Sequence, residues 1–425
     1  MAQTLKFGNK VWAAKEDSVL AYNDINNNYK PLPFSFSRAS IGTRVNKDGL
    51  IETMGQDIAR IDYTDSADGV LLLEPVSTNL ITYSEDFTDN SWDLLDATIE
   101  NNSSLATPEG INGVQELREN SDNDDHLIKS SGTFSLSDCS FSLFAKYKGN
   151  NRNIKLSLGT GKYASFNLQE GYVFDVQSST IAKIIKYSNG WYRCEISGNI
   201  SASKLNIILL NDTTEVYQGD GASGVYIWGS QIEALSYPTS YIPTSGSSVT
   251  RAAETCNNSG NSEVFNDSEG VFFANIYAFD NTTGNDGRIS VSDGTSNNRI
   301  SIIYDKLNNE IDANIFTGGS EQFQVSSSIN INQYNKALIK YKVNDCSLWI
   351  NGFEVATDTS ATMPSGLNKI NLASENGSTR VLQGKTKELG YYNTALTDAE
   401  LETLTSYRNW VSMVNELNLN IIYNG

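Results

Sequence analysis

The stretch that decides the fold is Gly224–Glu254, GVYIWGSQIEALSYPTSYIPTSGSSVTRAAE. Its first part is rich in β-branched and aromatic residues, which predicts a strand. Alternation places Val225 and Ile227 on one face of this strand. Trp228 and Ile232 fall on the other face. Both faces are apolar, so we expect another layer packed on each side of the strand.

The alternation stops after Leu235. Pro238 and Pro243 each remove a backbone donor, so a central strand cannot continue through them. The tyrosines that precede them can lie flat on a neighbouring surface. A Ser/Thr/Gly run then leads to Arg251, a composition typical of an extended connector. We interpret the stretch as the last strand of one β-domain, followed by a strap that leads to the next domain.

Period-two patterning extends to both sides of this stretch, and Gly, Asn and Ser turns interrupt it. Before the strap, the predicted strands are Ser140–Tyr147, Asn153–Leu158, Tyr163–Leu168, Tyr172–Val176, Ile181–Tyr187, Trp191–Ile196, Lys204–Leu210 and Gly224–Ile232. After it, they are Val271–Phe279, Arg288–Val291, Arg299–Tyr304, Ile311–Phe316, Ala337–Val343 and Ser347–Ile350. The sequence therefore predicts an all-β protein with two consecutive antiparallel β-sandwich (jelly-roll) domains.

Two local signals lie near the C-terminus. The dipeptide Asn351-Gly352 between apolar runs predicts a two-residue hairpin turn. Thr397 followed by Glu400 predicts a capping box at the start of a short helix, with Leu401 on its apolar side.

The predicted domain organisation has five parts. Residues 1–78 hold too little apolar sequence for a core of their own, so we expect an N-terminal arm, or a small β-unit that leans on the next domain or on neighbouring subunits. A jelly roll over 79–245, a linker over 246–262, a second sandwich over 263–408 and a tail over 409–425 complete the chain.

Composition excludes several classes of function. The chain has 425 residues and a formal net charge of −19, so binding to a nucleic-acid backbone is not expected. No apolar run is long enough to span a membrane, and the N-terminus lacks the hydrophobic core of a signal peptide.

The four cysteines, Cys139, Cys194, Cys256 and Cys346, are widely spaced and form no CxxC pair. Alternation places Cys139 and Cys194 on inward faces, which predicts reduced core thiols rather than disulfide or zinc ligands.

Three stretches resemble bacteriophage virion proteins of the tail-fibre or head-fibre kind. They are residues 7–52 (FGNKVWAAKEDSVLAYNDINNNYKPLPFSFSRASIGTRVNKDGLIE), residues 59–87 (ARIDYTDSADGVLLLEPVSTNLITYSEDF) and residues 228–254 (WGSQIEALSYPTSYIPTSGSSVTRAAE). In such proteins the last of these stretches ends a carbohydrate-binding-like jelly roll, and the C-terminal part of this chain resembles a laminin-G-like, concanavalin-type sandwich.

The resemblance implies a tail-fibre, tail-tip or head-fibre component that is assembled in the host cytoplasm and resides in the virion. It implies attachment to other virion proteins through the arm, display of lectin-like domains to host-surface glycans, and a homotrimer. A purely structural decoration protein and a polysaccharide-degrading tailspike-type hydrolase are the alternatives.

No catalytic centre is predicted, so we do not expect an enzyme. The chain has a single histidine, His126, in an acidic segment typical of a solvated loop, so neither a triad nor a multi-histidine metal site can be built. Carboxylates such as Glu74, Glu85, Asp86 and Glu233 lie in or near predicted strands, but no pair is singled out.

Sugar recognition needs aromatic faces beside hydrogen-bonding groups. Alternation in NGWYRCEIS turns Trp191, Arg193 and Glu195 away from the inward Cys194. Alternation in CSLWING likewise turns Trp349 outward. These four residues are the carbohydrate-binding candidates, with packing between layers or domains as the alternative.

The loop FDNTTGNDG resembles the acidic loop near the start of laminin-G-like domains. Its Asp280, Asn285 and Asp286 are candidates for a structural calcium site, because calcium prefers closely placed oxygen ligands. Solvated turn residues are the alternative. No other cofactor is expected.

Overall fold

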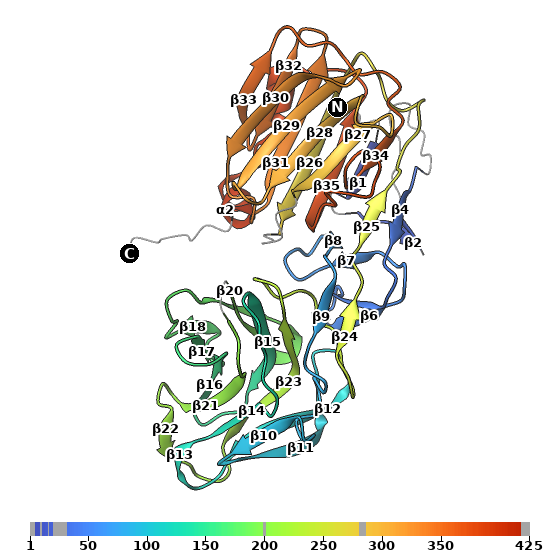
Figure 1. The fold of residues 1–425 in the computed structure, drawn as a ribbon. Helices are drawn as coiled ribbons and strands as arrows, with labels where there is room; N and C mark the ends of the chain where they lie inside the picture. The colour runs from blue at the N-terminus through green and yellow to red at the C-terminus, as the bar shows by residue number, and fades with distance from the viewer. Residues whose placement is uncertain are drawn as a thin grey trace. The chain divides into compact units, whose positions relative to one another are not determined.

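The computed structural model describes residues 5–8, 11–15, 17–19, 32–198, 201–279 and 286–417. Its regular structure is almost entirely β-strand, with two short helices near the C-terminus (Figure 1). The chain divides into two compact units. Unit 1 comprises Met1–Ala39, Met54–Pro75 and Ala253–Gly425, and unit 2 comprises Ser40–Thr53 and Val76–Ala252. The predicted all-β class is confirmed.

Unit 1 is a sandwich of two large antiparallel sheets with a small sheet beside them (Figure 1). The first sheet has the order β33 (Phe353–Asp358), β32 (Cys346–Ile350), β31 (Asn335–Lys342), β26 (Glu269–Ala278), β35 (Gly384–Tyr392), β8 (Val70–Leu73), β7 (Arg60–Asp62), with β1 (Leu5–Gly8) also paired to β35. The second has the order β30 (Ser320–Ser328), β29 (Glu310–Thr317), β28 (Arg299–Asp305), β27 (Gly287–Ser292), β34 (Lys369–Asn371). The small sheet has the order β2 (Ala14–Lys15), β3 (Ser18–Val19), β4 (Phe34–Ser37), β25 (Thr255–Asn257).

The segment predicted as an N-terminal arm, residues 1–78, supplies strands to both units. Its β1 and β8 pair with β35 and complete the first sheet of unit 1. Its β5 (Gly42–Val45) and β6 (Ile51–Met54) pair with each other. The division by contacts therefore differs from the predicted boundary at residue 78, because apolar pieces too short for their own core are buried in the sheets of larger units.

The C-terminal signals have the predicted structures. Asn351 and Gly352 both have positive φ, 50° and 92°, and join β32 to β33 as a tight hairpin. Helix α1 (Asp398–Thr405) begins with the capping box of Thr397 and Glu400 and buries Leu401. Helix α2 (Trp410–Glu416) follows. No helix in the described part of the chain is long and apolar enough to cross a membrane.

Unit 2 is a second sandwich of two six-stranded antiparallel sheets (Figure 1). One has the order β10 (Trp92–Leu95), β14 (Leu127–Ser130), β21 (Asn206–Asn211), β16 (Arg152–Ser157), β17 (Tyr163–Asn167), β18 (Tyr172–Phe174). The other has the order β11 (Ala97–Ala106), β12 (Asn112–Glu119), β23 (Gly224–Glu233), β15 (Cys139–Tyr147), β20 (Trp191–Gly198), β19 (Ile181–Lys186). Two further pairs are β13 (Asn123–Asp125) with β22 (Val216–Gln218) and β9 (Ser77–Asn79) with β24 (Val249–Arg251).

Strand β23 lies inside the second sheet, between β12 and β15, and both of its faces are covered. Val225 and Ile227 face the main core, as predicted, while Trp228 belongs to a smaller cluster on the outer face. Ile232 was predicted on the side of Trp228 but faces the main core. The reason is a bulge at Gly229, which has a φ of 63° and shifts the register against β15.

The cysteine prediction is confirmed. All four thiols are free and buried. Cys139 and Cys194 lie in the main core of unit 2, and burial raises the pKa of both.

The strap, residues 234–248, folds back onto its own unit and is anchored by Glu233. This carboxylate is fully buried and accepts hydrogen bonds from Ser77 Oγ at 2.6 Å and from the backbone nitrogen of Thr239 at 2.9 Å. The Thr239 hydroxyl also donates to it. Because a buried carboxylate needs such donors, Glu233 holds the turn that reverses the chain.

A buried ionic cluster joins the three chain segments of unit 1. The Glu254 carboxylate accepts from Arg38 Nη1 at 2.8 Å and from Arg60 Nη2 at 2.5 Å. Arg60 also binds Glu74 at 2.7 Å. Burial by itself lowers the pKa of Arg60, but the two carboxylates more than offset this effect, and its pKa is raised.

We predict that Glu254→Gln destabilises unit 1 by about 3–5 kcal/mol, because it leaves buried arginine charge uncompensated. The measurement is the free energy of unfolding in urea. The matched control is Glu269→Gln, whose partner Lys342 is about half exposed and lies 3.4 Å away. The control should lose less than about 1 kcal/mol. Equal losses in the two variants would contradict the prediction.

Candidate functional site

The structure brings Trp191, Arg193 and Glu195 together on β20, but it buries all three. Trp191 Nε1 donates to the Ala106 carbonyl oxygen at 2.9 Å, and Arg193 Nη2 donates to the Thr239 carbonyl oxygen at 2.8 Å. Alternation correctly separates these residues from the main core. Their burial fits the packing alternative rather than an exposed platform, because the strap lies over Arg193 and Trp191 packs in the outer cluster of unit 2.

Trp349 is buried in unit 1, with 6% of its surface exposed. Its indole nitrogen donates to Ser347 Oγ at 3.0 Å, and its ring packs in a cluster with Leu401 of helix α1. The helix therefore covers the face that alternation turned outward, and the burial of Trp349 also fits the packing alternative.

The structure describes one of the three calcium candidates, Asp286. Asp280 and Asn285 lie outside the described residues. Asp286 forms an ion pair with Arg380 at 2.5 Å. Among the described residues, no cluster of three or more His, Cys, Asp or Glu side chains is placed to hold a metal ion. The calcium site stays a prediction.

His126 is fully buried, so its predicted place in a solvated loop is wrong. Its Nδ1 lies 2.6 Å from the Asp96 carbonyl oxygen and its Nε2 lies 3.3 Å from the Tyr217 carbonyl oxygen. The ring also packs against Tyr217, with centroids 4.7 Å apart. The acidic segment around it continues into strands β13 and β14, which carry the ring inward.

An open hollow of about 260 Å³ lies in unit 2, where β11, β12 and β23 run side by side. It is comparable with the smallest ligand sites of proteins, about 300 Å³. Its lining combines one aromatic residue, one carboxylate, three side-chain amides and one hydroxyl, in Glu85, Asn101, Asn102, Ser103, Gly113, Val114, Gln115 and Trp228. This is the combination that sugar recognition requires.

Hydrogen bonds of the β11–β12 hairpin hold the amide groups in place. Gln115 Nε2 donates to Asn101 Oδ1 at 3.1 Å, and Gln115 Oε1 accepts from the backbone nitrogen of Phe87 at 2.7 Å. Asn102 Oδ1 accepts from Ser104 Oγ at 2.9 Å. Neither asparagine Nδ2 group donates to another described residue, so both can donate to a ligand. Ser103 is an exposed member of the same strand.

The strap supplies the wall behind Trp228. Tyr241 packs against the indole, with ring centroids 4.6 Å apart, and its hydroxyl donates to Glu85 Oε1 at 2.8 Å. Gly229 permits this packing, because a Cβ there would lie 2.9 Å from the Phe144 ring. Burial raises the pKa of Tyr241, so its phenol remains a donor to Glu85 and is not a ready nucleophile.

The carboxylate of Glu85 lies at this wall, and the carboxylate of Glu109 interacts with it. Glu85 is exposed at the edge of the hollow, but its carboxylate end lies against Tyr241 and Trp228. The resulting desolvation raises its pKa, and hydrogen bonds from the two aromatic side chains offset only part of the rise. Burial, together with the charge of Glu85, raises the pKa of Glu109 to about 6.

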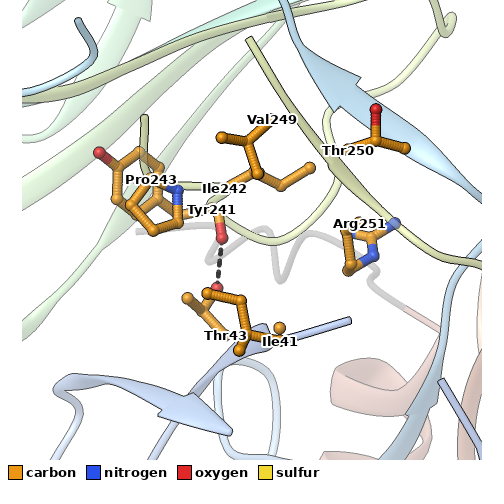
Figure 2. Close-up of a pocket in the computed structure, with 9 residues that line it drawn as sticks. Ile41, Thr43, Tyr241, Ile242, Pro243, Val249, Thr250 and Arg251 are labelled. Atoms are coloured by element: carbon orange, nitrogen blue, oxygen red, sulfur yellow. Dashed lines mark hydrogen bonds between the residues drawn. The ribbon is translucent and has the colours of Figure 1, made fainter. Parts of the chain in front are cut away.

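A second, nearly closed pocket lies under the other side of the strap (Figure 2). Its volume is about 10 Å³, close to the least that one water molecule needs, so it is not a ligand site. Figure 2 shows Thr43 beneath the strap, where its hydroxyl donates to the Tyr241 carbonyl oxygen at 2.5 Å. Arg251 Nη1 donates to Thr239 Oγ1 at 3.0 Å, so this region fixes the strap from below.

Residues 276–402 match the family model of the concanavalin A-like lectin/glucanases superfamily. The match lies within unit 1 and confirms that the C-terminal part of the chain contains a concanavalin A-like, laminin-G-like sandwich. It covers a minor part of the chain and therefore describes this sandwich alone. No curated protein matches the chain at a significant level.

Several solved structures have a distant likeness to the chain. The CBM40 of Ruminococcus gnavus IT-sialidase, bound to α2,3-sialyllactose, is 16% identical with a TM-score of 0.30, over 35% of this chain and 94% of its own. Trypanosoma rangeli sialidase is 13% identical with a TM-score of 0.29, over 91% and 81%. Domains LG4-5 of the mouse laminin α1 chain are 10% identical with a TM-score of 0.25, over 69% and 90%. At these TM-scores the likeness supports no conclusion about ligand or reaction.

Sequence reasoning missed the hollow, because it assigned no strands to residues 92–130. Strand β11 reads ATIENNSSLA, which is mostly polar and gives little apolar alternation. The usable signal was Asn102 and Ser103 beside a hairpin turn that contains Gly110, which has a φ of 81°. In the sequence, Glu85 is one carboxylate among several, and Trp228 is an apolar residue of a predicted strand.

We predict that Glu109→Gln stabilises the protein at about pH 7.5 but not at about pH 4. The folded-state pKa of about 6 exceeds the ordinary 4.5, so the folded state binds more protons between these values. Stability therefore falls as pH rises through this window, and the carboxylate is destabilising above it. The expected gain is about 1 kcal/mol, after allowing for solvent screening of a partly exposed group.

Urea unfolding of Glu109→Gln at both pH values provides the measurement. Glu170→Gln, an exposed site in the same unit, is the control and should show no such difference. A gain that is the same at both pH values would contradict the assigned cause.

Proposed function

We propose that the chain is a structural protein of a bacteriophage virion, a tail-fibre, tail-tip or head-fibre component, that binds host-surface glycans reversibly. The observation that carries the glycan-binding part is the hollow of unit 2, where Glu85, Asn101 and Asn102 surround an open space beside Trp228. The lectin-like sandwich of unit 1 supports the same assignment.

The virion part of the proposal rests on the resemblance of residues 7–52, 59–87 and 228–254 to phage fibre proteins. In such a particle the N-terminal segment contacts other virion proteins and the chain forms a homotrimer. Weak sites repeated on one particle then give useful avidity, because each further contact is intramolecular. The acidic surface, with a net charge of −19, fits a displayed protein that does not bind nucleic acid.

A polysaccharide hydrolase is the second candidate, and the pairing of Glu85 with Glu109 favours it. Glycosidases place two carboxyl groups about 5–10 Å apart, with one pKa raised so that it can act as an acid. The charge of Glu85 helps to raise the pKa of Glu109, so the two groups are within electrostatic reach.

We predict that Ser103→Tyr weakens glycan binding by at least tenfold, because the phenol fills the hollow without removing a structural contact. The measurement is binding of the full chain and its variants to a glycan array. Thr98→Tyr is the matched control, since Thr98 is an exposed residue of the same strand outside the hollow. This control should bind as the unaltered chain does.

Binding that is equal in Ser103→Tyr and the unaltered chain would place the glycan elsewhere. Silence of the folded chain on the array would favour the purely structural role. Release of reducing ends from a bound polysaccharide, lost in Glu109→Gln, would instead favour the hydrolase.

A further inference from the structure

The hollow of unit 2 has an unbalanced charge. Glu85 is the one ionisable residue in its lining. Neither Glu85 nor the neighbouring Glu109 has an arginine, lysine or histidine among the interactions of its carboxylate in the described part of the chain. Both groups are therefore partly desolvated carboxylates without a counter-ion.

Two basic residues at or beside β12 are paired with other carboxylates. Arg118 of β12 binds Glu116 at 2.9 Å and Glu100 at 3.6 Å. Lys148 binds Glu116 at 2.5 Å. Neither cation interacts with Glu85 in the described part of the chain, so Glu85 is not compensated by them.

A carboxylate without a counter-ion costs free energy in a partly water-excluded place, and the raised pKa values of Glu85 and Glu109 reflect this cost. Such a place attracts a cation and repels an anion more strongly than bulk solvent would. The hollow also offers amide donors from Asn101 and Asn102 and an aromatic edge, which suit the hydroxyl groups and C–H faces of a sugar ring.

We propose that this hollow binds a sugar unit that carries a free, protonated amine, with the Glu85 carboxylate as its counter-ion. The inference rests on the proposed glycan-binding function and specifies the ligand class. It predicts discrimination against sugars that carry carboxylate or sulfate groups, which would place an anion beside Glu85.

A bare divalent cation is a poorer fit to the same charge. Calcium takes about six to eight oxygen ligands at about 2.3–2.6 Å. The described residues contain no cluster of three or more side chains of the kind that would hold a metal. A sugar amine needs only one carboxylate and a few hydrogen bonds from its hydroxyl groups, and the hollow supplies these.

The test is titration calorimetry of the full chain at neutral pH with three probes: a glucosamine trimer, its fully N-acetylated form and 3′-sialyllactose. The first two share ring and linkage and differ in the charge of the amine. We expect the free-amine trimer to bind at least tenfold tighter than the acetylated trimer, and 3′-sialyllactose to bind least.

Glu85→Gln should abolish this preference, because the amide keeps an acceptor for Tyr241 but removes the charge. Glu170→Gln removes an exposed carboxylate elsewhere in unit 2 and should leave the preference unchanged. Circular dichroism of each variant should show that it is folded.

Each of the other outcomes would overturn the assignment of a sugar amine. Equal binding of the two trimers, or stronger binding of 3′-sialyllactose that Ser103→Tyr abolishes, would overturn the amine assignment and leave glycan binding at the hollow intact. Calcium binding that Glu85→Gln abolishes, without any preference for the amine, would replace the sugar amine by a metal ion. The absence of binding to every sugar by the folded chain would overturn this inference and the proposed function together.

Discussion

Unit 2 depends on the buried carboxylate of Glu233. A buried charge needs hydrogen-bond donors to replace its hydration. The Glu233 carboxylate accepts hydrogen bonds from Ser77, Gln231 and Thr239. Ser77 lies on β9, Gln231 lies in β23, and Thr239 lies in the strap. The carboxylate therefore ties the end of β23 to the strap and to the strand that precedes the sandwich.

The position of the strap explains both what is buried and what is left open. It lays Thr239 over Arg193, so this part of the outer face of β20 is packed rather than open. It also places Tyr241 against both Trp228 and Glu85, which builds the wall of the hollow. The strap thus packs over Arg193 on one part of the sheet and forms a wall of the hollow beside Trp228 on another part.

The stretch Gly224–Glu254 ends in a second buried carboxylate. Glu254 belongs to unit 1, where Arg38 and Arg60 bind it. Such clusters contribute little compared with well-packed apolar side chains, but removing one member is costly. This asymmetry makes them effective at fixing which segments of the chain come together, since a mispaired arrangement would bury unmatched charge.

The sequence pattern predicted the strands, the turn and the helix better than it predicted which segments cover them. Alternation, the Asn351-Gly352 turn and the Thr397 capping box are local signals, and the structure contains the features that they predict. The polar strand β11 was missed, because its Asn and Ser residues give no apolar period. Alternation also indicates which residues share a face of a strand, but it does not indicate whether a distant segment covers that face.

The failures at Trp191 and Trp349 follow from this limit. Trp191 packs in the outer cluster of unit 2 and donates to Ala106 of β11, and Trp349 packs with Leu401 of helix α1, so both contacts are non-local. His126 shows the same limit in reverse, since a locally acidic segment was folded inward by its strand partners. The hollow itself depends on the bulge at Gly229 and on the strap, neither of which has a periodic signal.

The most direct test of the account is a crystal structure of the full chain soaked with the glucosamine trimer. We expect sugar density in the hollow beside Glu85 and Trp228, with the strap in place behind it. Density on unit 1 alone, with the hollow empty, would contradict it.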